Sequence, residues 1–237
     1  MTEVRGPTTQ RQLPRTAASK EALENRRLMG RPPGGKLNAP KITAAALALI
    51  YDSGYQGLTM AALARNLNVS VSALYNHVTC KQDVLRLLEE HLIIQVNVSA
   101  FRSSNWEDAI YCWARSYRDA FAKHTPLIPV IAVLPVMGAP KTLAMYEEVT
   151  TGLLKAGFRE DRIIPIIAAI EAFIFGAALD VNAPEGIFNP GTLAHQAPTF
   201  TAVQAYHESG RTTEQRSDAA FRLGLEALIK GLGAFRL

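Results

Sequence analysis

The sequence predicts an all-α protein with a small N-terminal helical domain and a larger helical domain behind it. Apolar residues recur at the three- and four-residue spacing of amphipathic helices along most of the chain, and no strand-like alternation persists. Residues that favour helix starts and ends punctuate these stretches. We expect three zones: a disordered basic leader at 1–37, a helix-turn-helix domain at 38–95, and a regulatory and dimerisation domain at 96–237.

The first predicted helix begins after Asn38, a good N-cap, with Pro40 in its first turn. Gly54 can take the left-handed conformation that ends this helix. Five apolar residues fall on one helical face between these limits and predict a buried stripe. They are Ile42, Ala45, Ala46, Leu49 and Ile50.

Two short helices are predicted next. Thr59 caps one that runs from Met60 to about Leu67, and Leu58 before the cap is placed to pack against it. Asn68 tolerates a positive φ, and Ser70 can cap the following helix. A capping box at Thr79-Cys80-Lys81-Gln82 predicts the start of a fourth helix.

The second short helix combines an apolar stripe with a small, polar opposite face. The stripe consists of Val71, Leu74 and Val78. A helix-turn-helix unit lays such a polar face in the major groove of DNA. There Asn76 can pair with adenine, Ser72 can bond any base, and Ala73 can touch a thymine methyl. Tyr75, His77 and Lys81 are placed to reach phosphates. The alternative is an ordinary helical hairpin with a polar surface.

The segment Lys41–Leu88 resembles the DNA-binding domain of the TetR family of bacterial regulators. The matching residues are Ala45-Ala46, Leu49, Gly54-Tyr55, Leu58-Thr59, Leu63-Ala64, Leu67-Asn68-Val69-Ser70, Ala73 to Val78, and Lys81. The resemblance implies that Thr59, Tyr75, His77 and Lys81 hold the DNA backbone. It also implies that Ser72, Ala73 and Asn76 face the bases. Departures from the family pattern at Ala61, Asn68 and Val78 leave the operator sequence open.

The third zone reads as longer, more apolar helices. A capping box at Ser104-x-x-Glu107 opens the first, and Gly157-Phe158 closes a helix that spans about 139–156. A long apolar helix follows at 161–179. Residues 181–210 have little periodicity and predict a long loop, and Thr212-x-x-Gln215 caps the final helix.

This layout also resembles the C-terminal domain of the same family, in which the last two long helices pair with their twins in a four-helix dimer interface. The residues alone point to a dimer too, because the helices around Phe173 and Phe221 are more apolar than a small monomer hides easily. Helix-turn-helix proteins also commonly bind two half-sites. We therefore expect a homodimer that meets through its C-terminal helices.

Aromatic residues in the third zone predict a pocket for a small-molecule effector, whose identity the sequence leaves open. Apolar pockets need such residues and few charges. The pocket residues that we expect are Trp113, Tyr117, Tyr146 and Phe173. Glu171 lies in an apolar helix, where a buried carboxylate needs a partner, so it is either an effector contact or a satisfied interface residue.

Residues 1–40 carry eight basic and three acidic side chains, whereas the whole chain has a net charge of only +4. A basic tail on a near-neutral body favours a polyanionic partner. We expect an extended arm to enter an A·T-rich minor groove, with a passive tail as the alternative. The arm residues are Arg26, Arg27, Arg31 and Lys36.

The pattern of functional residues argues against an enzyme, a cofactor or a metal site. There is no Gly-rich phosphate loop, no His-Glu-x-x-His motif and no paired-cysteine metal spacing. The two cysteines and the basic N-terminus predict a cytoplasmic protein with no membrane partner. We expect a ligand-released repressor of operator DNA; an activator of the same fold, an enzyme or an interaction protein with a vestigial helix-turn-helix are the alternatives.

Overall fold

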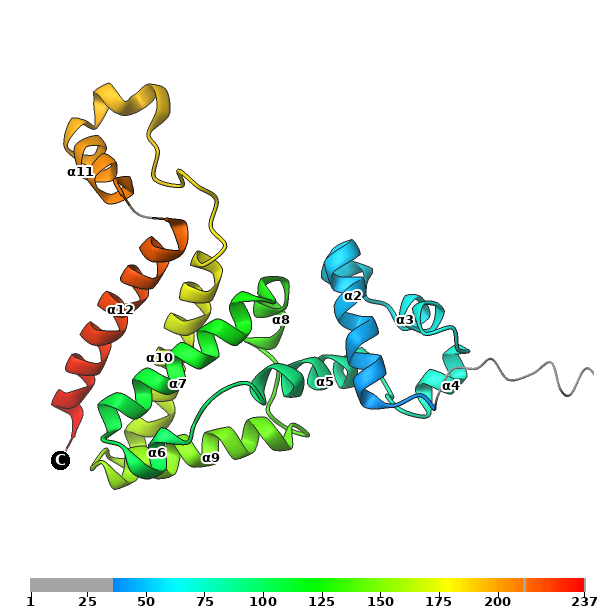
Figure 1. Ribbon diagram of the computed structural model, residues 1–237. Helices are drawn as coiled ribbons and strands as arrows, with labels where there is room; N and C mark the ends of the chain where they lie inside the picture. Colours follow the sequence, from blue (N-terminus) through cyan, green and yellow to red (C-terminus); the bar gives the residue numbers. More distant parts are fainter. Residues whose placement is uncertain (1–35, 211, 237) are drawn as a thin grey trace, which may run out of the picture. The chain divides into compact units, whose positions relative to one another are not determined.

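The computed structural model describes residues 36–210 and 212–236, and across those two stretches it contains helices and no strand (Figure 1). The predicted all-α class is confirmed. The chain divides into two units, Met1–Leu37 and Asn38–Leu237. All of the described helices lie in the second unit.

The first four helices of this unit lie close to their predicted positions. They are α2 (Ala39–Gly57), α3 (Met60–Asn66), α4 (Val71–Tyr75) and α5 (Lys81–Ile93). The Asn38 side chain caps α2 by accepting a hydrogen bond from the Lys41 backbone N–H at 3.1 Å. Gly54 has a φ of +68°, which interrupts the helical backbone one turn before the end of α2. A side chain at Gly54 would be strained at this φ.

Helices α2, α3 and α5 enclose a small apolar core. Helix α2 contacts both α3 and α5, and α3 contacts α4. The fully buried side chains at these contacts are Ile42, Leu58, Leu63, Leu74 and Leu88. Burial of each such side chain contributes on the order of 2 kcal/mol to the stability of the folded state. This core therefore holds α4 in place, with its outer face exposed.

Two details of this region differ from the sequence-based expectations. Val71 was expected in the inner stripe but is 39% exposed, because it is the first residue of a helix of five residues and lies at the rim of the core. The start of α5 is capped by Asp83, whose carboxylate accepts hydrogen bonds from the backbone N–H groups of Thr79 and Cys80. The predicted box around Gln82 is therefore shifted by one residue.

The next helices form the body of the regulatory region. They are α6 (Ala100–Ser103), α7 (Trp106–Ala122), η1 (Thr125–Leu127), α8 (Ile128–Ile131), α9 (Pro140–Lys155) and α10 (Glu160–Asp180). The N-cap of α7 is Asn105, which accepts from the Asp108 N–H at 2.8 Å, and not the expected Ser104. Gly157 follows the end of α9, and its φ of +89° stops the helix as predicted.

The segment expected to be a long loop contains regular structure. It holds η2 (Gly191–Gln196) and α11 (Pro198–Glu208), and α11 buries none of its side chains, which explains the missing apolar stripe. The final helices are α12 (Thr213–Leu232) and η3 (Gly233–Phe235). Thr212 and Gln215 form the predicted capping box of α12.

Helix α10 is the one helix of the described chain that is long and apolar enough to cross a membrane by length and composition. It packs against α7, α9 and α12. One side of it is buried, through Ile163, Ile166, Ile167, Ile170, Ile174 and Ala178. Helix α10 is thus a core helix of the regulatory body with a second, exposed apolar side.

Candidate DNA-binding surface and effector site

The turn between α3 and α4 is tight because of two residues. Asn68 has a φ of +53°, the one positive φ of a non-glycine residue in the described chain. The Ser70 hydroxyl then caps α4 by accepting from the Ala73 N–H at 3.1 Å. Asparagine tolerates this backbone conformation better than most residues, and serine satisfies the open N–H groups of the helix start. The sequence thus fixes the angle between the two helices locally.

The outer face of α4 consists of the residues expected to read bases. Ser72 and Asn76 are exposed, and Ala73 is half-buried. Leu74, on the opposite side of the helix, is fully buried. The helix is therefore held by its inner leucine while a hydroxyl, a methyl and a carboxamide remain accessible, and these groups match the chemistry of base edges in a major groove.

The four residues expected to contact phosphates lie around this face. Tyr75 and His77 are exposed. Thr59 is exposed and caps α3, its hydroxyl oxygen accepting from the Ala62 N–H at 3.1 Å. Lys81 is half-buried: its ammonium donates to the Tyr55 carbonyl oxygen at 3.3 Å and lies 3.7 Å from the centre of the Tyr55 ring. Lys81 thus differs from the other three, because its charged ammonium group already contacts another residue, Tyr55.

The predicted minor-groove arm falls largely outside the described residues. Arg26, Arg27 and Arg31 belong to the part of the chain that the structure does not describe, and Lys36 is exposed. The arm therefore remains an expectation from charge.

Two of the four aromatic residues expected in the effector pocket bind one carboxylate, and a third lies beside one of them. Tyr117 of α7 and Tyr146 of α9 both donate to the same oxygen, Oε1 of Glu171 on α10, at 3.2 and 2.8 Å. The Trp113 ring lies 6.1 Å from the Tyr117 ring. Phe173 instead stacks on Phe221 of α12, with ring centroids 5.6 Å apart. Residues two apart on a helix point in nearly opposite directions, so Phe173 does not share the side of Glu171.

A second carboxylate, Glu89 of α5, belongs to the same acidic group. Glu89 is only 5% exposed, and its Oε1 accepts from the Thr142 hydroxyl of α9 at 3.2 Å. Burial raises the pKa of Glu89 to about 7, and the nearby Glu90 and Glu171 carboxylates act in the same direction. Burial also raises the pKa of Glu171, although its two tyrosine hydrogen bonds oppose the shift.

Besides the bond between Thr142 and Glu89, Glu90 and Tyr51 join the first four helices to the regulatory body. Glu90 accepts from the backbone N–H groups of Lys141 and Thr142 at 2.8 and 3.1 Å, and so places a carboxylate at the N-terminus of α9. An anion there is stabilised by the helix dipole. The Tyr51 hydroxyl donates to the Lys123 carbonyl oxygen at 2.5 Å and lies 2.6 Å from Nδ1 of His124.

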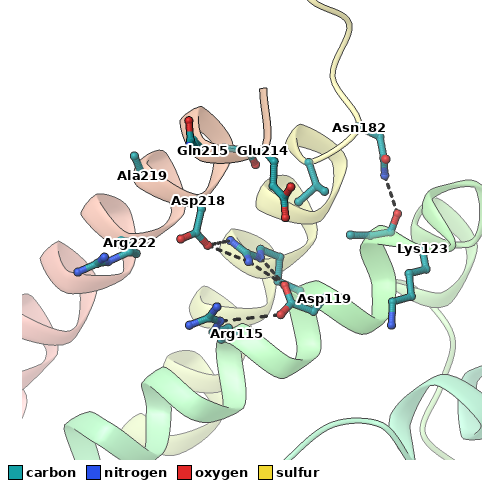
Figure 2. A pocket seen from close by; sticks show the side chains of 13 residues that line it. Arg115, Asp119, Lys123, Asn182, Glu214, Gln215, Asp218, Ala219 and Arg222 are labelled. Atoms are coloured by element: carbon teal, nitrogen blue, oxygen red, sulfur yellow. Dashed lines mark hydrogen bonds and ion pairs between the residues drawn. The ribbon is translucent and has the colours of Figure 1, made fainter. Parts of the chain in front are cut away.

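A polar groove of about 700 Å³ lies between α7, the end of α10 and α12 (Figure 2). Arg118, 6% exposed, is its buried charge. Its guanidinium contacts Asp119 at 2.7 Å and Asp218 at 3.1 Å and lies 4.2 Å from the centre of the Phe221 ring. The groove is rich in charge, and none of the four aromatic residues expected in the effector pocket lines it. The ion pair between Arg118 and Asp218 joins α7 to α12.

Comparison with protein families identifies the chain. Residues 42–88 match the model of the bacterial regulatory proteins of the tetR family. Residues 102–236 match the tetracyclin repressor-like C-terminal domain, and this match alone spans more than half of the chain. The chain belongs to the TetR family. It is a ligand-responsive DNA-binding transcription regulator, as the sequence analysis expected.

Relatives of this TetR-family protein include tetracycline repressors. It is 29% identical over 209 residues to the class A tetracycline repressor from transposon 1721 of Escherichia coli, which covers 85% of this chain and 93% of the relative. It is 27% identical over 202 residues to the class E repressor of Escherichia coli, with 84% and 92% covered. A possible TetR-family regulator from Streptomyces coelicolor A3(2) has the same fold, with a TM-score of 0.66, 27% identity and 84% and 100% covered.

Glu89 is a residue of the candidate site in this TetR-family member that the sequence-based expectations did not include. The signal was present, because Leu85, Leu88 and Leu92 define the buried side of α5 and Glu89 falls within that stripe. An acidic residue in an apolar stripe is unusual and needs a compensating partner. Tyr51 and Glu90 carried no comparable signal, since their partners lie 72 and 51 or more residues away along the chain.

Proposed function

We propose that this TetR-family protein is a repressor that binds operator DNA as a homodimer and leaves it when a small molecule binds. The observation that carries the proposal is the outer face of α4, where Ser72 and Asn76 are exposed above the buried Leu74. The tetracycline repressors among its relatives support repression over activation.

The roles within the DNA-binding surface follow from side-chain chemistry. Ser72, Ala73 and Asn76 read base edges in the major groove, because they are the small or bidentate groups on the accessible face. Thr59, Tyr75, His77 and Lys81 contact the DNA backbone, where hydroxyl, imidazole and ammonium groups bind phosphate without regard to sequence. The leader residues Arg26, Arg27, Arg31 and Lys36 add a minor-groove arm. We accordingly divide the chain into a basic leader at 1–37, a DNA-binding domain at 38–95, and a regulatory and dimerisation domain at 96–237.

The exposed side of α10 and α12 supports the homodimer. Ile164 is 70% exposed and Leu223 is 73% exposed. The residues that share their faces are small, which lets two helices approach closely. On α10 these are Ala168, Ala172 and Gly176, and on α12 they are Ala220 and Ala227, all of them exposed. A second copy of the same face would bury these residues in a four-helix arrangement.

The effector binds inside the regulatory body rather than in the polar groove. Tyr117 and Tyr146 donate to Glu171 there, and Trp113 packs beside Tyr117, so these side chains offer both apolar surface and hydrogen-bond partners. Phe173 lies against α12 and contributes to the connection between α10 and α12. The protein acts in the cytoplasm, where its DNA is, and has no catalytic role.

A DNA-binding and sizing experiment tests this function. The purified chain is titrated onto labelled DNA that flanks its own gene, and the mass of the complex is measured. Selective binding by two copies per site supports the proposal. Binding that is independent of DNA sequence, or a monomer on DNA, contradicts it. A reporter fused to the same flanking DNA distinguishes a repressor from an activator, because deletion of the gene raises expression only for a repressor.

A further inference from the structure

Two carboxylates, the buried Glu89 of α5 and the half-buried Glu171 of α10, form no ion pair with any of the described residues. Arg86, one turn before Glu89, lowers the pKa of Glu89 by its charge, but its Nη1 is bound to Asp83 at 2.8 Å. The hydrogen bonds to both carboxylates come from neutral hydroxyl groups.

The bonding of the two acids is also incomplete. Glu89 is 5% exposed, yet its Oε2 has no hydrogen-bond partner among the described residues. The two phenol groups on Glu171 share a single oxygen, Oε1. A buried carboxylate normally has either a full set of hydrogen bonds or a paired charge, since desolvation of an unpaired charge is expensive. Residues of four helices, α5, α7, α9 and α10, thus bind these two acids, and Oε2 of Glu89 has no donor among the described residues.

We infer that Glu89 and Glu171 together recognise a positively charged nitrogen, such as a protonated amine, on the effector. The inference rests on the proposed function and names the chemical class of the effector. The surrounding tyrosines suit this class: the faces of Tyr117 and Tyr146 attract cations, and their hydroxyl groups hold the Glu171 carboxylate in place. An anionic effector would meet two like charges at this point.

The position of Glu89 connects this recognition to DNA release. Glu89 lies on α5, and α5 packs against α2 in the core that supports the DNA-reading helix. The adjacent residue, Glu90, is bonded to the first turn of α9. A cation bound between Glu89 and Glu171 would therefore contact α5, which packs against α2 of the DNA-binding domain and against α7 and α9 of the regulatory body. A ligand changes DNA affinity only if it binds the two conformations of such an element unequally.

The test uses three sets of probes with matched skeletons on the full-length protein. Tryptamine, phenethylamine and 2-(2-naphthyl)ethylamine are each compared with the alcohol and the carboxylic acid of the same ring system by thermal shift and calorimetry at neutral pH. We expect the amines to raise the melting temperature, and the alcohols and acids to leave it unchanged. The inference is overturned if alcohols or acids bind as well as the amines, or if no amine binds.

Isosteric variants then locate the binding site. Glu89→Gln and Glu171→Gln keep the shape and remove the charge, and each should weaken amine binding at least tenfold. Glu147→Gln is the matched control, because Glu147 is an exposed acid on the neighbouring α9, and it should bind amines like the wild type. Circular dichroism verifies folding of each variant. Amine affinity that survives in both variants at the acidic pair overturns the assignment.

A DNA measurement separates this inference from the proposed function. If a neutral compound releases the protein from its DNA and the release persists in Glu89→Gln, the repressor function stands and the cation site is overturned. If amines bind the wild type and fail to bind Glu89→Gln, but DNA affinity does not change, the cation site stands and its role as the effector site is overturned.

Discussion

Arg118 and Asp218, 100 residues apart in sequence, join α7 to α12 through two guanidinium hydrogen bonds, both of 3.1 Å. Arg118 is almost fully buried, whereas the Asp218 side chain is 39% exposed. The guanidinium also lies over the Phe221 ring. This single side chain therefore combines an ion pair with packing between α7 and α12, and α12 is one of the two helices that we assign to the dimer interface.

Loss of Arg118 should destabilise the regulatory body more than loss of Asp218. Arg118→Ala removes two ion pairs and the contact with Phe221, and we expect a cost of about 2 kcal/mol, below the usual value for a broken buried pair because Asp218 stays partly hydrated. Asp218→Asn should cost less, since Asp119 still pairs with Arg118. Urea denaturation of both variants and the double variant measures the coupling. Equal costs for both single variants would contradict the central role of Arg118.

Asn76 and Tyr75 should differ in what they contribute to DNA binding. Asn76→Ala should relax base preference at one operator position, with a loss of about 1–3 kcal/mol there. Tyr75→Ala should weaken binding to specific and unrelated DNA by the same factor, because a phosphate contact carries no base information. Anisotropy titrations on an operator and its single-base variants measure both effects. Unchanged operator selection by Asn76→Ala would show that another surface reads the bases.

The stability of the protein should fall as pH rises through the range in which Glu89 ionises. The pKa of Glu89 is raised from 4.5 to about 7, so the folded state binds the proton more tightly than the unfolded state. Between these values the folded state holds more protons, and the free energy of unfolding decreases with increasing pH. The full effect is about 3 kcal/mol.

Glu89→Gln removes this titration, so the stability of the variant should depend less on pH than that of the wild type. Above neutral pH the variant should be more stable than the wild type. Thermal denaturation over a pH series in the absence of ligand gives the comparison. Glu147→Gln again serves as the control and should follow the wild-type curve. Parallel curves for wild type and Glu89→Gln would show that the Glu89 proton is not linked to folding.

Deletion of residues 1–35 should weaken DNA binding and reduce its dependence on salt. Residues 1–40 contain eight basic and three acidic side chains, so the leader is a major source of positive charge for DNA. Each phosphate contact contributes about 0.9 to the slope of log affinity against log salt concentration, and the truncated protein should lose that amount for each contact of the arm. Superimposable salt curves would instead indicate a passive tail.

Local signals predicted most of the helix boundaries. The caps at Asn38, Thr59, Ser70 and Thr212 and the positive φ of Asn68 each depend on neighbours within three or four residues, so the sequence alone contains their cause. The α7 cap was misplaced by one residue because Ser104 and Asn105 offer overlapping patterns. Helix α11 escaped prediction because an element without buried side chains lacks an apolar stripe.

The candidate effector site was only partly predictable, because its contacts are long-range. Glu171 was recognised as a buried acid in need of a partner, but those partners, Tyr146 and Tyr117, lie 25 and 54 residues away. The side of α10 that faces them depends on how four helices pack. Composition suggested an aromatic pocket and included Phe173, which the helical rotation places with Phe221 instead.

The contact between Lys81 and Tyr55 affects the entropic cost of DNA binding. An ammonium group has three donors, and the Tyr55 carbonyl takes one of them, which leaves two directed elsewhere. A lysine side chain that is already held over an aromatic ring has given up much of its rotamer freedom, worth up to about 2 kcal/mol, before DNA arrives. In the phosphate contact that we propose for Lys81, the ammonium group is thus preorganised, and less side-chain entropy is lost when DNA binds.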